Sequence, residues 1–177
     1  MDEVARKRGK DPLAYRLELL KGTPRAHKAL ERVAQMADWG RRREGRALGV
    51  AYIDYSGSQV AGIAEVSLDR ATGQIKVHNF WCAIDCGVAV QPDKIVAQTE
   101  SSIVYGLGLT LSERISIKDG VVEQSNFYDY ALPRMSDVSA YAHRSRQITI
   151  RPVPVRWRHQ SSPRRSRMQW PNWLAYV

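Results

Sequence analysis

Apolar side chains recur at helical spacing in the N-terminal part of the chain, and they predict two main helices. Asp11 followed by Pro12 is a typical helix start, because aspartate accepts hydrogen bonds from free N–H groups and proline fits the first turn. The first helix is therefore expected over residues 12–20, after a shorter helical stretch. The second is expected over residues 24–39, where Gly40 ends it.

The apolar pattern changes to strand-like alternation after the basic stretch 41–46, which we interpret as a solvated linker. Gly73 closes a five-residue hairpin loop and is expected in the left-handed conformation. Three strands are predicted, over residues 50–53, 60–68 and 74–84.

A long, mostly apolar helix is predicted over residues 92–111. Its many small residues allow close approach of other backbones, so we expect it to be buried on more than one face. A last hairpin, over residues 114–117 and 121–123, is predicted from the Asp119-Gly120 turn. The expected fold class is α+β, with helices followed by mixed β hairpins and the long buried helix.

Charge divides the chain of 177 residues into unlike parts. The whole sequence carries a net charge of +9, but residues 1–137 contain every acidic residue and are nearly neutral. Residues 138–177 hold eight arginines, four prolines and three tryptophans, and we expect this tail to be irregular. We therefore divide the chain into a helical segment with the linker (1–46), a central region (47–137) and the tail.

Several classes of protein are disfavoured by composition. No apolar run is long enough to span a membrane, and the start of the sequence is acidic where a signal peptide would be basic. Two cysteines cannot supply a disulfide framework or an iron–sulfur cluster, and the four histidines are scattered. Localisation stays open between the cytoplasm and the periplasm.

The strand end at Asp85 and Gly87, followed by a helix with Gln98 in its second turn, is the main candidate site. This arrangement points helix N–H groups and an amide side chain beyond the strand, which suits a phosphate or a heterocycle. A capped helix with a buried, satisfied glutamine is the alternative. Asp85 fits a loop acceptor better than a base, and Cys82 and Cys86 fit small buried residues better than ligands.

An ordered series of motifs over residues 2–138 resembles the second molybdopterin-binding region of the xanthine dehydrogenase/aldehyde oxidase family. Within that family the chain is similar to the isoquinoline 1-oxidoreductase beta-subunit branch. The motifs are Gly9-Lys10-Asp11-Pro12-Leu13, Ala64-Glu65-Val66, Asp85-Cys86-Gly87, Gln91-Pro92-Asp93, Ala97-Gln98-Thr99-Glu100, Tyr105-Gly106-Leu107-Gly108, the run from Glu123 to Tyr130, and Pro133-Arg134-Met135.

The resemblance implies a molybdenum hydroxylase that oxidises aldehydes or N-heterocycles with water as the oxygen source. It implies a molybdopterin cofactor, in the cytosine dinucleotide form, and a separate small iron–sulfur subunit. Gln98 matches the family's glutamine that hydrogen-bonds the pterin, and the backbone near Gly87 would lie beside it. No membrane span and no nucleic-acid partner are implied.

The family's catalytic glutamate has no counterpart here, because no acidic residue follows Asp137, and Glu100 and Glu113 do not match its motif. The first half of the family's cofactor site is also absent from this sequence. We therefore expect a fragment of the catalytic subunit that is inactive alone, with no catalytic residue and no metal ligand of its own. The alternative is a non-catalytic protein whose basic tail contacts nucleic acid or an acidic partner.

The tail itself is expected to be read in the wrong frame. Back-translating residues 148–176 and shifting by two bases permits a run that resembles what the family carries beyond its Pro-Arg-Met element. A tail of that origin has no evolved fold, and it would leave apolar surface on residues 60–130 uncovered. Resequencing the coding region tests this: a neighbouring frame that does not encode such a run would make the tail native.

Overall fold

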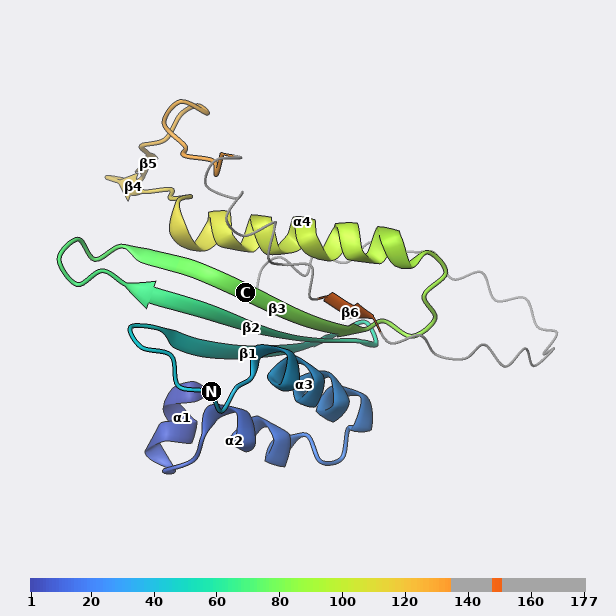
Figure 1. The fold of residues 1–177 in the computed structure, drawn as a ribbon. Helices are drawn as coiled ribbons and strands as arrows, with labels where there is room; N and C mark the ends of the chain where they lie inside the picture. Colours follow the sequence, from blue (N-terminus) through green and yellow to red (C-terminus); the bar gives the residue numbers. More distant parts are fainter. Residues whose placement is uncertain (135–147, 151–177) are drawn as a thin grey trace.

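A computed structural model describes residues 1–134 and 148–150. A four-stranded sheet is flanked by three N-terminal helices on one face, while a long helix runs along the other (Figure 1). The N-terminal helices are α1 (Asp2–Lys7), α2 (Pro12–Leu19) and α3 (Pro24–Ala37). The α+β class predicted from the sequence is confirmed.

Capping residues set the bounds of α2 and α3. The Asp11 carboxylate accepts hydrogen bonds from the backbone N–H groups of Leu13 and Ala14 at 2.9 and 3.0 Å, as its place before Pro12 predicted. The predicted end of α3 at Gly40 is wrong. Asp38 already adopts the left-handed conformation, with φ of 48°, and the Trp39 N–H bonds back to the Ala34 carbonyl, which closes the helix two residues earlier.

Two hairpins, a tight one and one with the longer loop 69–74, join the first three strands, which are β1 (Ala47–Tyr55), β2 (Ser58–Leu68) and β3 (Ile75–Asp85). β1 is longer than the predicted 50–53, because all nine of its residues pair with β2 in antiparallel register. The connecting turn at Ser56 and Gly57 has positive φ at both positions, which matches the twist of paired strands. Gly73 is left-handed as predicted, with φ of 73°.

The fourth strand corrects the expectation of an irregular tail. Residues Ile148–Ile150 form β6, which pairs in parallel with Cys82, Ala83 and Ile84 at the edge of the sheet. Three consecutive β-branched residues suit a strand, and the edge of β3 offers backbone groups as a partner. The rest of the tail, with the frame and disorder expected for it, lies outside the described residues.

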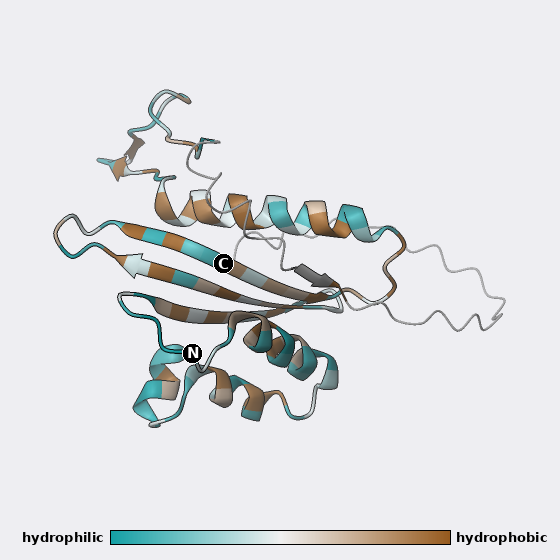
Figure 2. Cartoon of the chain, viewed as in Figure 1, coloured by the Kyte–Doolittle hydropathy of each residue, from teal (hydrophilic) through white to brown (hydrophobic). Residues whose placement is uncertain are grey.

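The main core lies between α3 and the sheet. Leu30 and Val33 of α3 are fully buried against Ile63 and Ala61 of β2 and Trp81 of β3. In Figure 2 the exposed side of α3 is hydrophilic, as expected of an amphipathic helix packed on one face. The helical segment and the strands therefore share one core.

The long helix α4 (Pro92–Leu111) corrects the expectation of burial on several faces. Only Thr99, Gly106 and Gly108 are buried along it, whereas Tyr105 is 58% exposed. Small residues permit close approach, but burial needs a neighbour, and in the described part of the chain none covers the outer side of α4. The predicted last hairpin is present in shorter form, as β4 (Ile117–Lys118) and β5 (Val121–Val122), two residues each where 114–117 and 121–123 were predicted.

No helix within residues 1–134 has both the length and the apolar character that a membrane crossing requires.

Candidate functional site

The turn that follows β3 is held by a buried aspartate. Asp85 is 3% exposed, and its Oδ1 accepts a hydrogen bond from the Gly87 N–H at 3.1 Å. One guanidinium nitrogen of Arg25, at the start of α3, donates hydrogen bonds to the same Oδ1 at 2.7 Å and to the Asp85 carbonyl oxygen at 3.0 Å. This carboxylate raises the pKa of the Arg25 guanidinium by hydrogen bonding. Asp85 is thus a loop acceptor, as predicted.

Sequence analysis missed Arg25, which is 60 residues away from Asp85 in the chain. Nothing in the sequence distinguishes Arg25 from any other arginine in the first turn of a helix. Only the packing of α3 under β3 brings its guanidinium to the strand end. The pair fixes the start of the β3–α4 connection to the opposite layer of the molecule.

Gly87 presents open backbone in this turn. Its φ is 81°, a left-handed conformation that favours glycine, and a Cβ placed there would meet nothing within 4 Å. The site therefore leaves room for another molecule to approach the main chain, although the Gly87 N–H itself is already bonded to Asp85.

Gln98 lies in the second turn of α4 with its side chain exposed. Its backbone carbonyl accepts a hydrogen bond from the Ser102 hydroxyl at 2.7 Å, but no described residue satisfies its amide group. The alternative of a buried, satisfied glutamine is therefore wrong for this chain. A free amide can both donate and accept, which is what binding a heterocycle with mixed polar groups requires.

Of the two cysteines, Cys82 is buried as predicted, whereas Cys86 is not fully buried. Cys82 is 3% exposed, and burial raises the pKa of its thiol to about 12, so it stays protonated near neutral pH. Cys86 is half-buried, and both thiols are free. Among the described residues no three histidine, cysteine or acidic side chains gather as metal ligands do.

A second polar cluster, at the opposite end of the sheet, was not anticipated. Glu65 is 1% exposed, and its carboxylate faces Arg43 at 3.1 Å and Arg46 at 3.2 Å, with an additional hydrogen bond from Asn79. Burial alone would raise the pKa of Glu65, but the hydrogen bonds from Asn79 and Arg46 and the nearby positive charges hold it below its ordinary value.

Arg43 also shows that residues 41–46 are more than a solvated linker. Its guanidinium donates to the Ala37 carbonyl at 2.7 Å and lies 5.7 Å from the centre of the Trp81 ring. Arg41 and Arg42 are exposed, as expected of a linker. The sequence places Glu65 in the strand predicted over residues 60–68, but nothing in it identified Arg43 and Arg46 as the partners of this carboxylate.

Comparison with known proteins gives a family match that covers most of the described chain. Residues 25–139 match the model of the molybdopterin cofactor-binding domain. This stretch includes α3, the sheet through β3, the turn at Asp85 and Gly87, and Gln98 on α4.

Curated relatives extend the same likeness. The chain is 42% identical over 142 residues to the beta subunit of isoquinoline 1-oxidoreductase from Brevundimonas diminuta, which covers 78% of this chain and 18% of that protein. It is 29% identical to a membrane-bound aldehyde dehydrogenase (pyrroloquinoline-quinone) of Gluconacetobacter polyoxogenes, covering 77% and 20%. It is 27% identical to one of the subunits of nicotinate dehydrogenase from Pseudomonas putida, covering 79% and 13%. The chain thus spans a fifth or less of these relatives.

Among solved structures, a Cu,Mo-CO dehydrogenase matches with a TM-score of 0.47 and 22% identity, over 55% of this chain and 12% of the other.

Proposed function

Since this chain belongs to the molybdopterin cofactor-binding domain family, among molybdenum hydroxylases of the xanthine dehydrogenase/aldehyde oxidase type, we propose that it forms part of the cofactor site of a catalytic subunit. The observation that supports this role most directly is the free, exposed amide of Gln98 on the helix that follows a tightly held strand end. That combination suits a polar heterocycle bound against α4.

The residues of this chain fit the pterin part of such a cofactor. Gln98 would donate and accept hydrogen bonds at the pterin edge, and the open backbone at Gly87 would allow close approach. Arg25 and Asp85 would act as positioning residues, because their contact holds the Gly87 turn in place. The bound cofactor supplies the redox chemistry that hydroxylates a substrate carbon with oxygen from water.

The remaining parts of the proposal concern the complete enzyme. Aldehydes or N-heterocycles would be its substrates, in keeping with the names of the isoquinoline, aldehyde and nicotinate enzymes to which the chain is similar. The cofactor would be the cytosine dinucleotide form, and a small iron–sulfur subunit would accept the electrons. No residue of this chain is assigned a catalytic role. Glu113 does not match the family's catalytic motif, and its carboxylate is engaged within the chain, where it accepts a hydrogen bond from the Tyr130 hydroxyl at 2.5 Å.

The role of Gln98 is tested by Gln98→Ala at the matching position of a full-length relative. Loss of the amide should lower the molybdenum content of the purified enzyme, measured by elemental mass spectrometry. The pH dependence of the remaining activity should not change, because an amide does not titrate near neutrality.

Ser101→Ala is a matched control, since Ser101 is exposed on the same helix. It should leave the molybdenum content unaltered. A Gln98→Ala enzyme with full molybdenum and a shifted pH profile would contradict the proposed role.

A further inference from the structure

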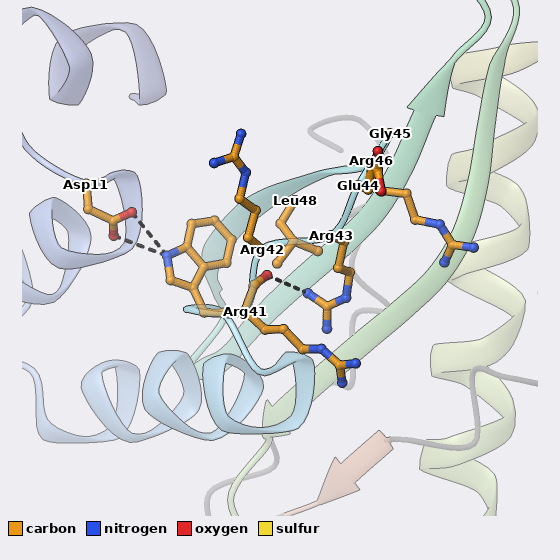
Figure 3. A pocket seen from close by; sticks show the side chains of 9 residues that line it. Asp11, Arg41, Arg42, Arg43, Glu44, Gly45, Arg46 and Leu48 are labelled. Carbon is orange, nitrogen blue, oxygen red and sulfur yellow. Dashed lines mark hydrogen bonds between the residues drawn. The ribbon is translucent and has the colours of Figure 1, made fainter.

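The basic loop 41–46 lies at the end of the sheet opposite the Gly87 turn and borders a hollow in the surface. We define the arginine cavity as this hollow of about 820 Å³, which the loop lines together with residues of β1, the end of α3 and the start of α2. Its lining residues are Asp11, Trp39, Arg41, Arg42, Arg43, Glu44, Gly45, Arg46 and Leu48. Figure 3 shows them from close by.

Two of the four arginines are committed to the protein itself. Arg43 and Arg46 face the buried carboxylate of Glu65, and Arg43 also ties the loop to the last turn of α3. These contacts hold the loop against β2 and the end of α3. The cavity is therefore held in shape before any ligand arrives, which lowers the entropic cost of binding.

Arg41 and Arg42 are the two that remain available. Both are exposed, and no described residue forms an ion pair or a hydrogen bond with either guanidinium. Two acids also line the cavity: the exposed Glu44, and Asp11, whose two oxygens accept from the Trp39 indole N–H at 3.2 and 3.1 Å. The four arginines of the lining outnumber them, so the cavity keeps an excess of positive charge. The cavity thus offers two unpaired positive groups beside a fixed indole.

The directions of these two side chains decide what kind of ligand fits. In Figure 3 the Arg41 and Arg42 side chains leave the loop in different directions, which suits a ligand with more than one anionic group. An extended chain with carboxylates at intervals can reach each of them, and a guanidinium fork pairs well with a carboxylate. The mixed polar and open lining also differs from the mostly apolar pockets that enclose small molecules.

We propose that the arginine cavity is a docking site for an extended acidic segment of another polypeptide, held by Arg41 and Arg42. Much of the affinity comes from charge, so binding should weaken as salt screens the contacts. The site lies at the far end of the sheet from Gly87 and Gln98, because β1 begins at the loop and pairs with the end of β2. The proposal therefore stands independently of the cofactor site.

The test measures binding of a short, fluorescein-labelled peptide rich in Asp and Glu to the complete 177-residue chain by fluorescence anisotropy. The variant Arg41→Ala/Arg42→Ala should bind about tenfold more weakly at low salt. Circular dichroism should remain that of the parent chain, because both side chains are exposed and unpaired.

Arg32→Ala/Arg70→Ala removes the same charge from exposed positions outside the cavity and serves as the matched control. It should retain the affinity of the parent chain. Both variants keep the eight arginines of residues 138–177, so a loss of affinity in the first variant alone is due to the cavity. Equal loss in both variants would overturn the proposal in favour of a net-charge effect. Tighter binding of inorganic phosphate or of a single-stranded oligonucleotide that depends on Arg41 and Arg42 would also overturn it.

Discussion

Glu65 illustrates how one buried charge can organise a loop. Its carboxylate is removed from water, yet Arg43, Arg46 and Asn79 surround it and favour the ionised form. The penalty of burying a charge is offset only while these partners stay in place. The residue therefore connects β2 to the loop that forms the arginine cavity.

Removal of this charge should be costly. Glu65→Gln would leave the guanidinium groups of Arg43 and Arg46 without the negative charge they face, and we expect a loss of about 3 kcal/mol in the free energy of unfolding near neutral pH. Urea denaturation followed by circular dichroism measures it. Glu44→Gln, at an exposed position of the same loop, should change stability by less than about 0.5 kcal/mol.

The same substitution should alter the response to acid. The pKa of Glu65 is lower in the folded chain than its ordinary value of 4.5, so the folded state binds fewer protons. Its contribution to stability is therefore complete above that value and is lost as the pH falls through the folded pKa. Below pH 4.5 the parent chain should lose stability more steeply than the Gln variant, and parallel curves would contradict this.

At the scale of elements, Asp11 joins two helices. It caps α2 by accepting from the N–H groups of Leu13 and Ala14, and it also accepts a hydrogen bond from the indole N–H of Trp39, which follows α3. One carboxylate thus caps the start of α2 and holds the Trp39 side chain that follows α3. The predicted cap is local, whereas the contact with Trp39 depends on how the helices pack.

Asp11→Ala should destabilise the chain by about 1–2 kcal/mol, because two helix N–H groups lose their acceptor. Asp11→Asn keeps a side-chain oxygen that can cap and should cost less than the Ala variant. Thermal unfolding of the three proteins gives the comparison. If Ala and Asn were equally harmful, charge rather than capping would be the main contribution of Asp11.

At the scale of the whole molecule, the described residues would supply only part of the proposed cofactor site. The chain spans 18% of the length of the Brevundimonas diminuta isoquinoline 1-oxidoreductase relative. One free amide and one turn offer few of the contacts that a large cofactor needs. The outer side of α4, with Tyr105 and Leu109 exposed, is available to further protein.

We therefore expect the purified 177-residue chain, expressed in a host that makes the cofactor, to retain little molybdenum and to oxidise neither aldehydes nor N-heterocycles. Elemental analysis and dye-reduction assays check both statements. A full-length relative expressed and purified in parallel should retain the metal. Stoichiometric molybdenum together with hydroxylation by the short chain would contradict the expectation.

Sequence alone was sufficient for features that a few neighbouring residues determine. The start of α2 at Asp11-Pro12, the left-handed Gly73 and the Asp119-Gly120 hairpin all follow from local backbone preferences. Motif order, which depends on sequence alone, also identified the family that the match to residues 25–139 confirms.

Tertiary structure decided the contacts between distant residues. Arg25 meets Asp85 across 60 positions, and Arg43 meets Glu65 only because the loop folds over the sheet. It also decided how far α4 is buried, since small residues allow a neighbour but do not supply one. Local preferences act within one turn or strand, whereas burial and charge pairing depend on which surfaces meet, and that is set by the packing of the whole chain.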